Sequence, residues 1–198
     1  MTRYTLLANM SLAVLMTVAT PVVMTVPFVQ VGAAQAATGS FEAALDLHNA
    51  ARDGKGDAEA AVQALEEFTA TEPGKAAGWA YLGSAYTIRA RDSVNVTDKI
   101  RFTNRGLRYL DQAVELAPQD FVVRLVRANV AMNLPSMFGR EASLVEDLMT
   151  LDAMYQSAGD PHMAGPMVGI YDALATHAAG VKDWSALKAA AEAAAGSI

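Results

Sequence analysis

The sequence contains no cysteine among its 198 residues. A disulfide framework, a thiolate metal site, a cysteine nucleophile and a lipidated N-terminal cysteine are therefore all excluded. Charged residues are also few, at 18%, whereas apolar residues make up 53% of the chain. This composition excludes a disordered tail and a protein that binds nucleic acid through basic charge. The length suits one domain, with or without a leader.

Sequence motifs for catalysis are missing as well. There is no G-x-S-x-G, no phosphate-binding loop and no glycine-rich dinucleotide loop. The three histidines, His48, His162 and His177, do not have the spacing of metal ligands. We therefore expect no catalytic residue, no cofactor and no metal site, so that the protein is not an enzyme.

A copper site is the alternative that the C-terminal half leaves open. Thioether and imidazole groups suit Cu(I), but methionines also fill irregular gaps between packed helices. The residues concerned are His162, Met163 and Met167, with Met149 and Met154 nearby.

The first 36 residues form a leader by composition. Arg3 is their one charged residue, an apolar stretch runs from Leu6 to about Val31, and Ala34-Gln35-Ala36 follows. These are the parts of a secretory signal peptide, so we expect residues 1–36 to be removed, leaving a domain of residues 37–198. The destination would be the periplasm or the exterior.

A retained membrane anchor is the alternative reading of the leader. Its apolar stretch is long enough to cross a bilayer, although Pro21 and Pro27 argue against one uninterrupted helix. In that case the protein would be a membrane-anchored accessory subunit of an envelope complex.

The mature chain has the apolar spacing of helices. Leu107, Leu110, Ala113 and Val114 recur at three and four residues, and no stretch alternates with the period of a strand. Proline, glycine and polar clusters separate the helical stretches. The sequence predicts an all-α protein with helices over residues 40–52, 57–71, 76–91, 98–116, 120–133, 140–156, 163–179 and 183–195.

A repeat signature lies in the third of these helices. Trp79, Leu82, Gly83 and Tyr86 fit W-x2-L-G-x2-Y. Ala113 and Pro118 follow as the end of a second helix and its proline stop. The chain therefore resembles a tetratricopeptide-repeat (TPR) protein. The resemblance implies a right-handed superhelix of about four antiparallel helical hairpins. This repeat is longer than the usual unit by about 11 residues, which we place around residues 91–102.

The resemblance also implies a function. Proteins of this family bind a peptide or a partner protein in the concave groove of the superhelix, so we expect an adaptor or scaffold. Two groups of residues map to that groove: Ala77, Ala80, Ser84, Thr87 and Ile88, then Val122, Leu125, Asn129, Met132 and Asn133. Ala80 and Leu125 occupy the places of the family's carboxylate-binding lysines, so we expect no such clamp.

Basic residues gather between Ile88 and Arg127, where eight of them face five acidic residues. They form either a solvated face or a positive patch, including Arg89 and Arg108, that steers an acidic partner toward Ser84, Thr87, Asn129 and Asn133. We expect no nucleic-acid partner, and a membrane only if the leader is retained; the oligomeric state stays open.

Two arginines in an apolar setting need ionic partners. Arg124 and Arg127 lie among valines and leucines, and a buried guanidinium must be paired. Glu146 or Asp147, on the following helix, is the predicted partner.

We predict that the mature protein begins at Ala37, because signal peptidase requires small residues at the two alanine positions of Ala34-Gln35-Ala36. N-terminal sequencing of protein from the envelope fraction measures this. An intact Met1 on membrane-bound protein would show that the leader is an anchor.

Overall fold

The computed structural model describes residues 32–197, with side chains from residue 41. Residues 32–197 form eight α-helices and two short 3-10 helices, without a strand. The α-helices are α1 (Gly32–Arg52), α2 (Ala58–Thr71), α3 (Ala76–Asp92), α4 (Val96–Leu116), α5 (Phe121–Met132), α6 (Glu141–Ala158), α7 (Ala164–His177) and α8 (Trp184–Ala195). The 3-10 helices are η1 (Ser136–Phe138) and η2 (Pro161–Met163).

Polar side chains fix where several helices begin. Asp57, Asn95, Asp120 and Asp183 each accept a hydrogen bond from a backbone N–H in the first turn of α2, α4, α5 and α8. An N-cap of this kind satisfies a donor that has no partner within the helix. The helix ends therefore agree with the predicted ones to within two residues, except that α1 begins at Gly32 rather than at residue 40. Most of the predicted leader, residues 1–31, lies outside the described residues.

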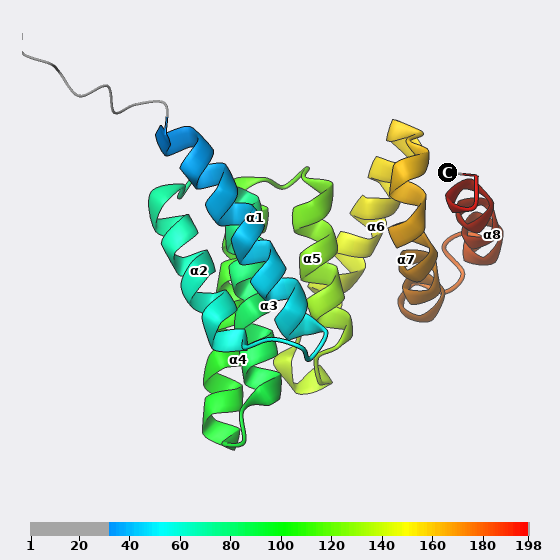
Figure 1. Ribbon diagram of the computed structural model, residues 1–198. Helices are drawn as coiled ribbons and strands as arrows, with labels where there is room; N and C mark the ends of the chain where they lie inside the picture. The colour runs from blue at the N-terminus through cyan, green and yellow to red at the C-terminus, as the bar shows by residue number, and fades with distance from the viewer. Residues whose placement is uncertain (1–31, 198) are drawn as a thin grey trace, which may run out of the picture. The chain divides into compact units, whose positions relative to one another are not determined.

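Consecutive helices pair as four hairpins, α1–α2, α3–α4, α5–α6 and α7–α8. Among the first helices of the first three hairpins, α3 also lies against both α1 and α5 (Figure 1). The all-α fold class of stacked helical hairpins is thus confirmed.

The extra length of the second hairpin lies within its helices. We placed the extra residues around residues 91–102, between helices expected to end at residue 91 and to begin at residue 98, and the observed connection is shorter than that. Residues up to Asp92 continue α3, residues from Val96 belong to α4, and only Ser93–Asn95 join them. The Asn95 cap starts α4 at once, so the extra residues extend both helices beyond their neighbours.

Two glycines hold α3 and α4 close together. A Cβ atom added to Gly83 would lie 2.7 Å from the carbonyl oxygen of Gly106, and one added to Gly106 would lie 2.5 Å from that of Gly83. Real Cβ atoms essentially never lie this close to another heavy atom. The backbones of the hairpin therefore meet at a point where any larger residue would separate them.

Trp79 lies beside this contact and is partly buried. Its indole ring packs against Tyr109 of α4, with the ring centroids 5.4 Å apart. Its Nε1–H donates a hydrogen bond of 2.8 Å to the carbonyl oxygen of Pro73. The signature tryptophan thus ties the start of α3 both to α4 and to the turn before it, whereas Leu82 and Tyr86 are fully buried.

A buried ionic cluster joins α5 to α6. Asp147 is fully buried and accepts hydrogen bonds from Arg124 at 2.7 Å and from Arg127 at 2.7 and 2.8 Å. Glu146 accepts from Arg124 at 2.6 Å, which lowers the pKa of its carboxyl group. Asp111 of α4 adds a third acid, which pairs with Arg127 and Arg140. The predicted pairing of the two arginines with Glu146 and Asp147 is confirmed.

Replacing Gly83 by alanine should destabilise the protein by about 1–3 kcal/mol, because the new methyl group forces α3 and α4 apart. Gly169→Ala is the matched control: it also lies within a helix, and its added Cβ would meet nothing within 4 Å. That variant should gain about 0.5–1 kcal/mol from lower chain entropy in the unfolded state. Urea unfolding measures both, and equal effects would contradict the close approach.

Asp147→Ala should cost about 3–5 kcal/mol, because it leaves two buried guanidinium groups without their shared acid. Glu146→Ala, at a neighbouring carboxylate whose side chain is 60% exposed, should cost less than about 1 kcal/mol. Chemical denaturation of the two variants tests this. A loss of similar size in both would show that burial of Asp147 does not set the energy of the cluster.

Candidate functional site

A pocket of about 900 Å³ opens among α1, α3 and α5, the first helices of the first three hairpins. The N-terminal half of α4 and the η1 segment complete its walls. This volume is within the range of sites that hold small ligands or short segments. The polar or charged residues of its lining are His48, Arg52, Tyr81, Ser84, Thr87, Arg91, Lys99, Thr103, Asn129 and Asn133.

The structure brings four of the predicted groove residues together in this pocket: Ser84 and Thr87 of α3, Asn129 of α5, and Asn133 at its end. Thr87 Oγ1 donates 2.8 Å to the carbonyl oxygen of Ser84, and Asn133 Nδ2 donates 2.8 Å to that of Asn129. Asn129 is exposed, so its amide can donate to and accept from a ligand.

The predicted lining is only partly that of the pocket. Ile88, Val122 and Leu125 line it together with the four polar residues. Ala80, in contrast, is fully buried in the core between α3 and α5, and Met132 packs against the core of the C-terminal hairpins.

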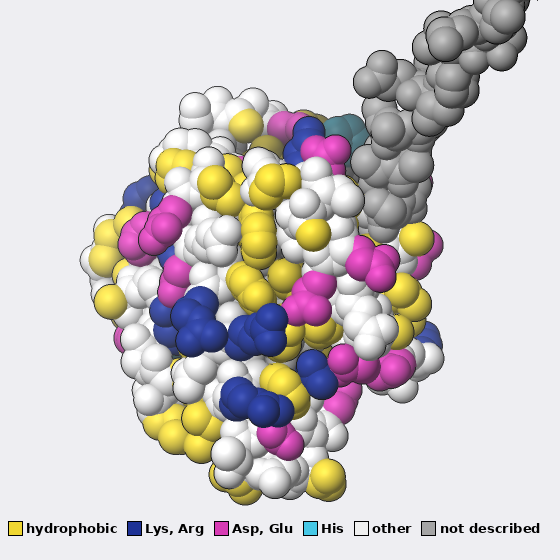
Figure 2. Space-filling model, turned by 90° about the vertical axis from the view of Figure 1, so that its left-hand side faces the viewer, with side chains coloured by type: hydrophobic (Ala, Val, Ile, Leu, Met, Phe, Trp, Pro, Cys, Tyr) yellow, Lys and Arg dark blue, Asp and Glu magenta, His cyan; other side chains and the backbone are white. Residues whose placement is uncertain are grey.

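Arg89 and Arg108 do not line the pocket. Arg89 pairs with Glu59 of α2, and its guanidinium lies 4.1 Å from the centroid of the Phe102 ring. Arg101 and Arg105 of α4 are likewise paired, with Asp98 and Glu66. Figure 2, which views the side of α2 and α4, shows basic side chains gathered with acidic ones among them.

The eight basic residues therefore do not form one patch. Two of them, Arg91 and Lys99, line the pocket, and two more, Arg124 and Arg127, are buried in the ionic cluster. Outside both places lie Arg89, which pairs with α2, and Arg101, Arg105 and Arg108 of α4. The sequence could not separate them. Which face of each helix is covered by a neighbour and which is exposed depends on the tertiary packing.

The buried His48 and the half-buried Ser84 form a pair in the pocket wall. His48 Nε2 and Ser84 Oγ are hydrogen-bonded at 2.9 Å, and the His48 ring lies edge-on to Tyr81. Burial lowers the pKa of His48, and the charge of Arg52 acts in the same direction, against the bond to Asn49. The imidazole is therefore kept neutral, and the pair joins α1 to α3.

The pair lacks what a serine nucleophile needs. Ser84 lies in the middle of α3, where backbone N–H groups are committed to helical bonds and cannot stabilise an oxyanion. We therefore assign His48 and Ser84 a role in holding the pocket wall.

Sequence reasoning missed the basic end of the pocket. Arg52 ends α1, Arg91 lies in the last turn of α3, and Lys99 lies in the first turn of α4. Hydrogen bonds link them: Arg91 donates to the carbonyl oxygen of Arg52 at 3.0 Å, and Lys99 donates to that of Arg91 at 2.8 Å. The signal was present in the sequence, but it lay at helix ends, outside the first-helix positions that the repeat register maps.

The residues of the copper alternative differ in accessibility. His162 is exposed in η2, whereas Met167 is fully buried in the core of the C-terminal hairpins, with Met149 packed against the same core. Within residues 32–197 no group of three histidine or acidic side chains could hold a metal. No helix in the same range is long and apolar enough to cross a membrane.

No protein-family model matches the chain, and no curated protein sequence matches it. Among solved structures, the chain is similar to a thermophilic TPR protein of Thermus thermophilus, with 18% sequence identity and a TM-score of 0.41. The similarity covers 81% of this chain and 94% of that one.

Acid should destabilise the fold through His48. Burial lowers the pKa of His48 in the folded protein, so the folded state favours the neutral imidazole. The contribution of His48 to the free energy of unfolding is therefore complete above the ordinary histidine pKa of about 6.5. It is lost as the pH falls below that value, by at most about 1.4 kcal/mol per pH unit. Urea unfolding over a pH series should show a flatter profile for His48→Gln than for the wild type. The exposed His162→Gln is the control, and a His48→Gln profile parallel to the wild type would contradict the assignment.

Proposed function

We propose that this chain is an exported, non-enzymatic interaction module that binds a segment of a partner protein in the pocket among α1, α3 and α5. The fold supports the class of function, since stacked helical hairpins present a rigid wall on which a segment can lie. The leader composition supports export to the periplasm or the exterior.

The observation that carries the proposal is the mixed lining of this one pocket. Ser84, Thr87, Asn129 and Asn133 offer hydroxyl and amide groups, and they lie among aliphatic side chains such as Ile88 and Leu125. A peptide presents the same mixture, because each residue brings a backbone donor and acceptor together with its side chain. Polar groups that become buried with the peptide would thus keep hydrogen-bond partners.

The double variant Asn129→Ala, Asn133→Ala should raise the dissociation rate of a partner captured from the envelope fraction by about tenfold, since two amide hydrogen bonds are lost. Surface plasmon resonance on the purified partner measures the rate. Gln63→Ala with Gln119→Ala is the matched control, because it removes two exposed amides that do not line the pocket.

The control should leave the dissociation rate unchanged. If the folded asparagine variant binds every captured partner as tightly as the wild type does, the pocket is not the binding site. Thermal unfolding of both variants verifies that they are folded.

A further inference from the structure

Exposed apolar side chains gather at the pocket. Four large apolar side chains of its lining are 41–75% exposed, and none of them belongs to the buried core: Val96, Ile100, Val122 and Met137. Ile100 and Val96 belong to the extended start of α4, and Met137 belongs to η1 on the opposite wall. Burying such surface against a partner would be favourable.

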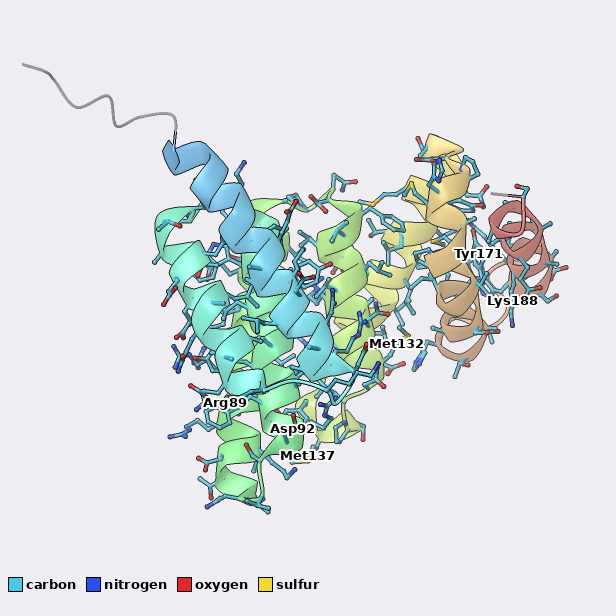
Figure 3. All side chains as sticks on the ribbon, viewed as in Figure 1. Arg89, Asp92, Met132, Met137, Tyr171 and Lys188 are labelled. Carbon is cyan, nitrogen blue, oxygen red and sulfur yellow. The ribbon has the colours of Figure 1, made fainter. Side chains whose placement is uncertain are left out.

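The lining is also electrically one-sided. It includes Arg52, Arg91 and Lys99, and no aspartate or glutamate. All three cations lie toward the end where α3 meets α4, the end at which Figure 3 labels Asp92 and Met137. One end of a pocket with a mixed apolar and polar lining is therefore basic.

Two of the three cations are already paired. Arg52 pairs with Asp53 at 2.9 Å, and Arg91 pairs with Asp92 at 2.7 Å. Arg91 is further bound to the end of α1, since it donates to the carbonyl oxygens of Ala51 and Arg52. With the two arginines paired to Asp53 and Asp92, the basic end keeps one net positive charge, which is that of Lys99.

Lys99 is held in place by the end of α3. Its Nζ donates to the carbonyl oxygen of Arg91 at 2.8 Å and lies 3.5 Å from that of Ala90, and within residues 41–197 it forms no ion pair. An ammonium group has three donors, so it can still bind an acidic ligand. The dipole of α4 favours an acidic residue in its first turn, whereas the carbonyl oxygens at the end of α3 favour the ammonium group that is bound to them.

We infer that the segment bound in the pocket is apolar and carries one acidic side chain, whose carboxylate binds Lys99 at the α3–α4 end. This inference rests on the proposed function and adds the chemistry of the partner. A peptide fits better than an acyl chain, because the exposed amide of Asn129 would face methylene groups of an acyl chain without a hydrogen-bond partner.

The test uses short synthetic peptides of Leu, Val, Ala and Asn, in which each position in turn carries Glu, Gln or Lys. Binding to the mature protein is measured by fluorescence anisotropy. In the best series, the Glu peptide should bind about fivefold more tightly than its Gln counterpart, the Lys peptide should bind least, and the difference should shrink at high salt.

Lys99→Glu should reverse this order, so that Lys peptides bind more tightly than Glu peptides. Lys75→Glu is the matched control, because Lys75 is exposed at the start of α3 and does not line the pocket. It introduces the same charge change and should leave the order of the wild type intact. Circular dichroism should show both variants folded.

The possible failures are distinct. Peptides that bind without preference for Glu, or a preference that Lys99→Glu does not alter, overturn the inference and leave the proposed function standing. If no peptide binds, both fail. Two further measurements would also overturn the inference by identifying another occupant. Tight binding of dodecanoate in place of peptides would assign an acyl acid to the pocket. A dimer in light scattering that Lys99→Glu dissociates would assign a second copy of the chain.

Discussion

The close approach of Gly83 to Gly106 is the constraint on which the rest of the second hairpin depends. Because the two backbones meet, α3 and α4 lie side by side, and Leu82, Tyr86 and Leu110 are fully buried beside the contact. The same approach lets α4 extend past its neighbours while it stays attached to α3. That extension supplies Val96, Lys99 and Ile100, which form one wall of the pocket.

Much of the fold could be predicted because its signals are local. Turn residues and N-caps such as Asp57 and Asp120 act on the helix that follows them, so helix ends could be read directly from the sequence. Arg124 and Arg127 could be paired with Asp147 because a buried guanidinium needs an acid and the next helix offered one. The signature of α3 likewise placed Ser84 and Thr87 on the face that lines the pocket.

The rest of the site depended on tertiary packing. The extra residues around 91–102 lengthen the two helices because the turn between them is short and Asn95 caps α4 at once. The number of residues alone did not reveal this. Arg91 and Lys99 came to the pocket because of that turn, whereas Arg89, two residues before Arg91, faces Glu59 of α2. Neutral His48 lies in α1, where the repeat pattern is weakest, so its bond to Ser84 had no sequence signal.

The central claim is that the pocket among α1, α3 and α5 receives a segment of another protein. The most direct test places a photoreactive amino acid at Ile100, which lines the pocket and is 41% exposed, or at Leu116 of the same helix, which is 48% exposed and outside it. Irradiation of native cells should link Ile100 variants to a partner protein and leave Leu116 variants free. Cross-links from Leu116 alone, or from both positions equally, would contradict the account.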